Sequence, residues 1–197
     1  MRSPEELLAR QGDLQREAVE LTRELGLEEV LGKAGRVVAV GSSVTGLMVW
    51  RDLDFVVDAP GLSIGAAFQA MLPLLARCRA ARYENDLGGR RHYFVLRIPW
   101  RGERVWKLDV SFFVDGAPTA VERFQQEVLT RLTDEARLAI LELKEARHRD
   151  PAYPEVYGGY EICDAVLNHG VRTLTELDAY LRECQPGTTT QSRASSP

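Results

Sequence analysis

The sequence predicts an α/β (α+β) fold, in which a small mixed β-sheet flanked by helices precedes a C-terminal helical bundle. Short apolar runs rich in β-branched and aromatic residues are confined to residues 36–114, and such runs are typical of strands. Apolar residues recur at helical spacing before residue 32, and helix-start signals recur after residue 117. The 197 residues, 45% of them hydrophobic, suffice for one domain or a core with a small helical appendage.

Three regions are expected along the chain. Residues 1–117 form the core with its N-terminal helix, and residues 118–184 form the C-terminal helical region. Residues 185–197 have almost no apolar side chains and are expected to be a disordered tail.

The first element is a helix that begins after Ser3. Ser3 can cap the helix, Pro4 suits its first position, and Glu6 completes a capping box. Leucines and an alanine then recur at spacings of four, three and four residues, which gives an apolar stripe. Gly26 and Gly32 mark the end of this helical segment.

The sheet region alternates strands with two helices. Pro73 falls inside the longer helix and either kinks or divides it. The expected elements are a strand at 36–40, a short helix at 43–49, a strand at 53–57, a helix at 64–82, a loop at 85–89, and strands at 91–98 and 103–114 that form a hairpin.

Four helices are expected after residue 117. Capping patterns open two of them, at Thr119 with Glu122 and at Thr173 with Glu176. Their expected ranges are 119–132, 133–149, 154–169 and 173–182.

The most informative stretch lies between residues 40 and 55. A Gly-Ser pair, Gly41 and Ser42, is followed by nine residues and then by Asp52-Leu53-Asp54. Alternate strand residues point to the same face, so the two carboxylates project side by side. Such a pair is stable mainly with a cation or proton between its members. Mg²⁺ often bridges carboxylates to phosphates, and a glycine turn lets backbone N–H groups approach a phosphate.

This arrangement resembles the polymerase-β-like nucleotidyltransferase superfamily. The resemblance covers residues 36–114 and implies a third carboxylate on a later strand, where Asp109 fits. It implies that Asp52, Asp54 and Asp109 hold Mg²⁺, with two ions in the active complex. The reaction implied is attack of an acceptor hydroxyl on the α-phosphorus of an NTP, with release of pyrophosphate. Three aspartates between apolar residues favour an active site over solvated strand ends.

Further residues are candidates for binding the nucleotide. Gly41, Ser42 and Ser43 would cradle the phosphates, and Arg51 would either neutralise a phosphate or form a structural ion pair. The order of Lys144 and Asp164, with Lys107-Leu108-Asp109 before them, resembles the AbiEii/MenT-type toxin nucleotidyltransferases. Trp50 departs from that group, which tends to have Ser or Thr at this position. Lys144 is equally well interpreted as a surface lysine paired with a glutamate.

The acceptor has two candidate classes. A small molecule, as in aminoglycoside-type nucleotidyltransferases, is slightly favoured and requires an acidic pocket to which Asp150, Glu161 and Asp164 could contribute. A tRNA acceptor, with an antitoxin protein as partner, requires the basic stretch 77–107 to lie beside the cleft. That stretch has nine basic and three acidic residues, whereas residues 1–30 have four arginines and eight acids. An inactive nucleotide-binding module is a third alternative.

The remaining composition excludes other classes. Three scattered cysteines and three distant histidines lack the spacing of a zinc site or a disulfide framework. No apolar run approaches the roughly 18 residues needed to span a bilayer. A cytoplasmic protein without membrane partners is therefore expected.

Overall fold

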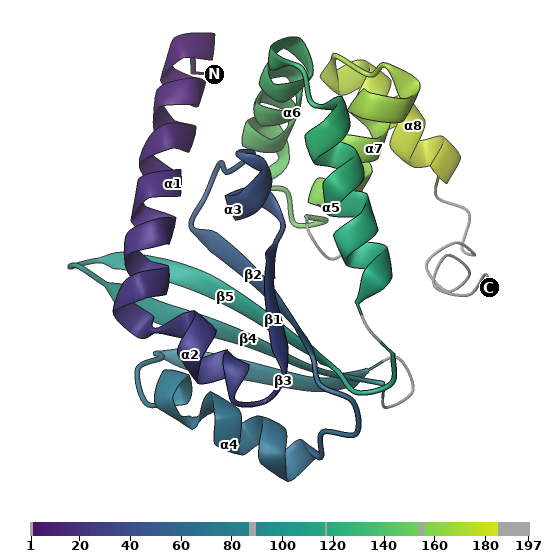
Figure 1. Cartoon of the computed structure of the whole chain (residues 1–197). Helices are drawn as coiled ribbons and strands as arrows, with labels where there is room; N and C mark the ends of the chain where they lie inside the picture. Colours follow the sequence, from purple (N-terminus) through teal and green to yellow (C-terminus); the bar gives the residue numbers. More distant parts are fainter. Residues whose placement is uncertain (1, 87–89, 117, 154–155, 185–197) are drawn as a thin grey trace.

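The computed structural model describes residues 2–86, 90–116, 118–153 and 156–184. Five strands form one mixed sheet in the order β1-β2-β5-β4-β3, with helices on both of its faces (Figure 1). The elements are α1 (Pro4–Leu25), α2 (Leu27–Gly32), β1 (Arg36–Val40), α3 (Ser42–Thr45), β2 (Asp52–Asp58), α4 (Ile64–Leu75), β3 (Ala80–Asp86), β4 (Arg91–Trp100), β5 (Arg104–Phe113), α5 (Thr119–Arg131), α6 (Asp134–Arg147), α7 (Gly159–His169) and α8 (Leu174–Cys184). The predicted α/β class is confirmed.

The strand register brings distant parts of the sequence together. β1 pairs with β2 in antiparallel fashion, and β2 pairs in parallel with β5. The predicted hairpin is confirmed as β4 and β5, which are antiparallel. Its turn places Arg101 at φ 45° and Gly102 at φ 87°, and positive φ at both central residues matches the twist of the flanking strands.

The N-terminal helix begins as predicted. Ser3 accepts a hydrogen bond from the Glu6 backbone at 3.2 Å, and the Glu6 carboxylate accepts one from the Ser3 backbone at 2.8 Å. The helix ends at Gly26, whose φ of 60° is left-handed and suits glycine. The chain then turns into α2, which ends at Gly32.

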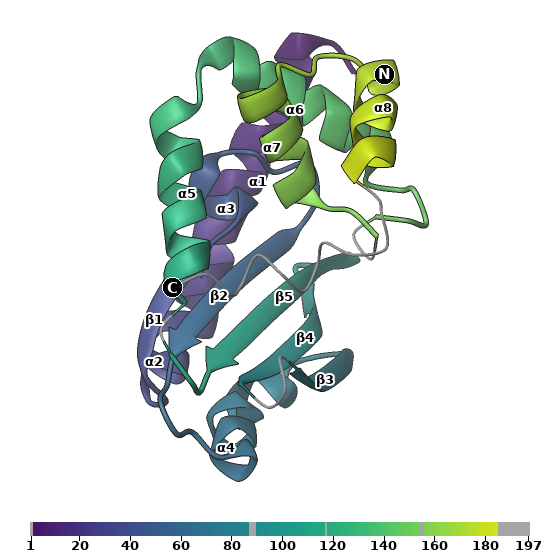
Figure 2. The ribbon, with the colours of Figure 1, turned by 90° about the vertical axis from the view of Figure 1, so that its right-hand side faces the viewer.

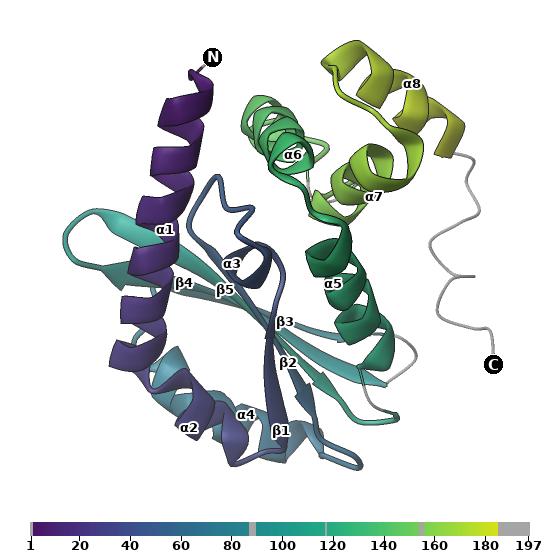
Figure 3. The same ribbon diagram turned by 45° about the horizontal axis from the view of Figure 1, so that its top comes forward.

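Buried apolar side chains of the described residues form two clusters. The first fills the space between the sheet and α1, α2 and α4. The second lies among α5, α6, α7 and α8. The irregular segment 47–50 joins them, because Met48 packs in the first cluster whereas Leu47 and Val49 pack in the second. Figure 3 shows α1 on one side of the molecule and α6, α7 and α8 on the other, with α3 between them.

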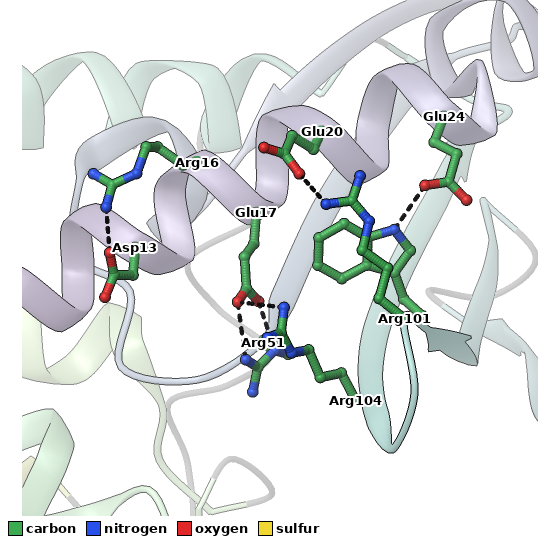
Figure 4. Close-up of polar contacts among 9 residues, drawn as sticks. Asp13, Arg16, Glu17, Glu20, Glu24, Arg51, Arg101 and Arg104 are labelled. Carbon is green, nitrogen blue, oxygen red and sulfur yellow. Dashed lines mark hydrogen bonds and ion pairs between the residues drawn. The ribbon is translucent and has the colours of Figure 1, made fainter.

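Ion pairs fix α1 against the β4–β5 hairpin (Figure 4). Glu17 binds Arg51 through two hydrogen bonds of 2.7 and 3.1 Å and contacts Arg104 at 3.1 Å. Glu20 pairs with Arg101 further along the helix. The acidic N-terminal helix therefore neutralises part of the basic stretch 77–107 within the molecule.

Two predicted elements of the core differ from the structure. The short helix expected at 43–49 ends at Thr45, because Gly46 adopts a left-handed φ of 69° and the segment after it is not helical. The helix expected at 64–82 ends at Leu75, with Pro73 inside its last turn. Residues 80–82, predicted to be helical, instead begin β3, which pairs with β4.

The C-terminal helices follow the predicted order with one corrected cap. α5 has no side-chain cap, because Pro118 stands at its N-cap and has no side-chain acceptor, while Thr119 is the first helical residue. Glu122 pairs with Arg36 instead of completing the predicted capping box. The predicted box at Thr173 is present. The predicted tail and the start of the helix expected at 154–169 fall on residues outside the described ones. No helix in the described ranges has the length and apolar character that a membrane span requires.

Candidate active site

Three carboxylates from two neighbouring strands meet on one face of the sheet. Asp52 and Asp54 alternate along β2, and the parallel register sets Asp109 of β5 directly beside Asp54. One oxygen from each carboxylate lies within 4.8 Å of the other two. The predicted place of the third carboxylate is therefore confirmed.

A lysine and a tyrosine hold this cluster together. Lys107 Nζ lies 2.6 Å from Asp109 Oδ2 and 3.4 Å from Asp52 Oδ1. The Tyr93 hydroxyl donates to Asp109 Oδ2 at 2.7 Å. Burial alone would lower the pKa of Lys107, but the negative charges of the surrounding aspartates have the larger effect and raise it. Burial and the nearby Asp109 raise the pKa of Tyr93, so its hydroxyl keeps its proton and remains a donor.

The carboxylates of β2 are poised to take up a cation. Burial raises the pKa of Asp52, and burial together with Asp52 and Asp109 raises the pKa of Asp54 well above its usual value. Oδ1 of Asp109 is buried and accepts no hydrogen bond from another described residue, and Oδ1 of Asp52 is buried beside the Lys107 ammonium, 3.4 Å away. Carboxylate oxygens of this kind are the ligands that Mg²⁺ prefers, so the residues fit the ion.

Gly41 lies so close to this cluster that a residue with a side chain would not fit there. Its φ of 76° is rarely adopted by residues with a side chain. A Cβ atom on Gly41 would lie 2.4 Å from Asp54 Oδ2. The glycine thus leaves the space beside the carboxylates open to a ligand.

The two serines after Gly41 differ in placement. Ser42 lines the same cleft as the carboxylates. Ser43 is buried, and its hydroxyl donates to the Val40 carbonyl at 3.4 Å. The Ser43 side chain lines a hollow beside α1 and α2 rather than this cleft.

Lys144 belongs to the cleft, which excludes the interpretation as a surface lysine. Only 4% of the residue is exposed, and Nζ donates to the Leu47 carbonyl at 2.7 Å. The ammonium also lies 5.4 Å from the centre of the Trp50 ring. Burial lowers the pKa of Lys144, against the opposing influence of Asp52 and Asp54.

Two other predicted nucleotide-binding residues lie elsewhere. Arg51 pairs with Glu17 on α1, which is the structural alternative expected for it (Figure 4). Asp164 accepts hydrogen bonds from Asn168 and from Tyr180 of α8. Neither residue lines the cleft that holds the carboxylates.

The cleft has a volume of about 1000 Å³. It runs from the carboxylates between α3, α5 and α7 on one side and across β3 and β4 on the other. Figure 2 shows the helices above β2 and the open sheet beyond. Aromatic side chains line the helical side, among them Trp50, Phe124, Tyr153 and Tyr160.

The sequence did not predict roles for Lys107, Tyr93 or Tyr153. Lys107 is two residues before Asp109, so alternation on a strand could have placed it on the same face. Tyr93 reaches Asp109 only through the β4–β5 register, which no local pattern reveals. Tyr153 lies in a connection between helices and enters the cleft through the fold of that connection.

Solved structures share this fold. An RNA terminal U-transferase described as cytoplasmic aligns with a TM-score of 0.57 and 18% identity, over 85% of this chain and 55% of its own. The chain has the polymerase-β-like nucleotidyltransferase fold. The Cid1 poly(U) polymerase bound to Mg and 3′-dATP aligns with a TM-score of 0.57 and 17% identity, over 85% and 56%. Cid1 with its short product ApU aligns with a TM-score of 0.54 and 16% identity, over 85% and 55%.

The chain spans about half the length of the solved structures it matches. No protein-family model matches the sequence. No curated protein matches it either. The nucleotidyltransferase fold predicted from the Gly-Ser pair and the three aspartates is confirmed by the structural likeness.

Proposed function

We propose that this chain is a metal-dependent nucleotidyltransferase that moves the nucleoside monophosphate of an NTP to a hydroxyl group of an acceptor. The cluster of Asp52, Asp54 and Asp109 in a cleft of about 1000 Å³ supports the proposal most strongly. Buried carboxylates beside an open cleft suit a nucleotide whose phosphates bind Mg²⁺ together with the carboxylates. The solved structures with the same fold include complexes with Mg and nucleotides.

The carboxylates would hold the metal and orient the reacting groups. Asp52, Asp54 and Asp109 are the proposed ligands, and two Mg²⁺ ions are proposed for the active complex. When bound, Mg²⁺ supplies positive charge that stabilises the attacking and leaving oxygens of an in-line displacement. Tyr93 and Lys107 occupy Asp109 Oδ2, which leaves Oδ1 as the atom facing a ligand or an incoming proton.

Other residues would hold the triphosphate. Gly41 and Ser42 let backbone groups approach the phosphates, and Lys144 offers a buried ammonium on the opposite side of the cleft. The Ser43 side chain takes no part in this proposal, because its hydroxyl bonds to the strand before it. Positioning and electrostatics would supply most of the rate enhancement.

Transfer of label tests this proposal. The chain is incubated with NTPs labelled at the α-phosphate, Mg²⁺ and candidate hydroxyl acceptors, and labelled product and pyrophosphate are measured. Asp52→Asn and Asp54→Asn are each expected to lower transfer by about a hundredfold or more. Asp58→Asn is the matched control, because it changes an aspartate of the same strand outside the cluster. A folded double variant, Asp52→Asn with Asp54→Asn, that retained full activity would overturn the proposal.

The acidic residues predicted to bind a small-molecule acceptor lie outside the cleft. Asp150 accepts bonds from the Ala152 backbone and Tyr157, and Glu161 caps α7 through the Gly158 backbone. Asp164 faces α8. None of the three lines the cleft. The neighbouring structures are named for RNA terminal U-transfer and poly(U) synthesis, which makes an RNA hydroxyl the acceptor that we propose to test first.

A further inference from the structure

Two rows of side chains cross the sheet from the carboxylates to the outer strand. In the strand register, residues directly opposite one another share a face. The Arg82 row consists of Arg82, Val95, Asp109 and Asp54, and the Arg97 row consists of Ala80, Arg97, Lys107 and Asp52. Each row thus begins at a carboxylate of β2 and includes an arginine on β4 or β3.

The outer parts of both rows are open to solvent. Arg82 and Arg97 are exposed and line the same cleft as the aspartates. The helices of the C-terminal half lie over the β1 and β2 side of this face and leave β3 and β4 uncovered in Figure 2. Neighbouring strands lie about 4.8 Å apart, so Arg82 is about 10 Å from Asp109 and Arg97 about 10 Å from Asp52.

The two arginines differ from four other basic residues of the stretch 77–107, which are engaged elsewhere. Arg77, Arg101 and Arg104 are engaged with glutamates of α1 on another side of the sheet. Lys107 is committed to the aspartates. Arg82 contacts Glu84 at 3.3 Å, but both side chains are about half exposed, and such a pair exchanges readily for another anion.

The lining between the arginines and the carboxylates suits a chain with apolar and charged parts. Val95 gives the Arg82 row a small apolar surface between Arg82 and Asp109, and Ala80 adds another on β3 beyond Arg97. Arginine binds phosphate oxygens through two parallel hydrogen bonds. The open face therefore combines arginines, which bind phosphates, with small apolar surfaces. A polycationic acceptor would be repelled by these arginines.

We propose that the β3–β4 part of the cleft binds the acceptor, and that the acceptor is the hydroxyl end of a phosphodiester chain whose phosphates contact Arg82 and Arg97. This inference rests on the proposed nucleotidyl transfer and adds where the acceptor binds and which residues hold its phosphates. The acceptor hydroxyl would lie at the carboxylate end of the rows, beside Asp109. The preceding phosphates would lie over β4 and β3.

Anisotropy of a fluorescein-labelled oligoadenylate of twelve ribonucleotides tests the inference without nucleotide or metal. The double variant Arg82→Ala with Arg97→Ala is expected to weaken binding by about tenfold or more at low salt. The slope of log affinity against log salt is expected to fall by about 1.4, for two phosphate contacts on a single strand. Glu84→Gln is expected to tighten binding, because it removes the carboxylate that competes for Arg82.

The matched control is Arg77→Ala with Arg101→Ala. It removes the same charge from the same stretch of sequence, but on the side of α1, and is expected to leave affinity within twofold. Equal losses in both double variants, or none in the Arg82 and Arg97 variant, would overturn the inference. So would a wild-type chain that leaves the oligonucleotide free and is thermally stabilised by spermine. Thermal stabilisation by Mg²⁺ and NTP, measured on the same variants, reports separately on the proposed transfer site and is expected to be unchanged.

Discussion

At the scale of single residues, the site depends on two neighbouring residues, Asp54 and Gly41, whose roles differ. The carboxylate of Asp54 is held among like charges, while Gly41 beside it must lack a side chain. The spacing between the Gly-Ser pair and Asp-x-Asp was enough to predict that Gly41 and Asp54 belong to one site. Gly41 follows the end of β1, and Asp54 of β2 pairs with the last residue of β1. The contribution of Lys144 could not be predicted in the same way. Its burial depends on how α6 packs against the segment 47–50, which no local pattern specifies.

Replacing Gly41 with alanine separates backbone strain from damage to the site. Gly41→Ala is expected to lower the free energy of unfolding by about 1 to 3 kcal/mol and to displace Asp54, which abolishes Mg²⁺-dependent nucleotide binding. Gly61→Ala is the matched control, because Gly61 has a φ of 71° but no atom within 4 Å of an added Cβ. Urea unfolding and nucleotide-induced thermal shifts measure the two effects. Equal nucleotide binding by both variants would contradict the close approach to Asp54.

Asp54 is expected to cost the metal-free protein stability. Because burial and the neighbouring aspartates raise its pKa in the folded state, ionisation disfavours folding at a pH above that raised value. Asp54→Asn is therefore expected to raise the free energy of unfolding at pH 7 by about 1 kcal/mol or more. The gain should shrink as the pH falls and disappear below the ordinary Asp pKa of about 3.9, where the carboxyl is protonated in both states.

Urea unfolding in the presence of EDTA measures this gain at both pH values. Asp115→Asn, at an exposed position after β5, is the control and is expected to change stability little. A variant at Asp54 that is less stable than the wild type at pH 7 would show that the carboxylate stabilises the fold.

At the scale of elements, the sheet carries the site and α1 stabilises the sheet from behind. The hairpin was predicted from two apolar runs around a Gly-containing turn, and its register then placed Asp109. β3 was missed because Ala, Arg and Glu at 80–84 are good helix formers. Pairing with β4 overrides that local preference, and the strand supplies the outer edge of the cleft.

Glu17 is expected to be the main polar link between α1 and the sheet. Its carboxylate binds both Arg51 and Arg104 and is 18% exposed, so its removal leaves two guanidinium groups without this partner. Glu17→Ala is expected to lower the free energy of unfolding by about 1.5 to 3 kcal/mol. Asp13→Ala removes the exposed pair with Arg16 on the same helix and is expected to cost less than about 1 kcal/mol (Figure 4). Thermal unfolding of the two variants compares them directly, and equal losses would contradict the special place of Glu17.

At the scale of the whole molecule, the cleft lies where two apolar clusters meet. The segment 47–50 sends Met48 into one cluster and Leu47 and Val49 into the other, and it leads directly into Asp52. The sheet thus contributes the carboxylates, and the helical part contributes Lys144 and the aromatic wall. The sequence predicted both parts and their order. It could not predict how closely they pack, since that depends on side chains from helices and strands far apart in the sequence.

Lys144 tests whether the helical part completes the site. Lys144→Met keeps the length of the side chain and removes its charge, and it is expected to weaken binding of an NTP with Mg²⁺ by about tenfold or more. Lys33→Met, on the opposite layer at the end of α2, is the control. Unchanged affinity in a folded Lys144→Met protein would confine the nucleotide site to the sheet and α3.

The most direct test of the account is calorimetric titration with UTP and ATP analogues that carry nitrogen between the α- and β-phosphorus atoms. Such analogues bind without being consumed, so the measurement isolates the metal and nucleotide site. We expect the wild type to bind the analogues in Mg²⁺ and not in EDTA. The double variant Asp52→Asn with Asp54→Asn is expected to lose binding, while Asp58→Asn binds like the wild type. Equal binding with and without Mg²⁺, or by the double variant, would contradict the claim that these aspartates form a metal-dependent nucleotide site.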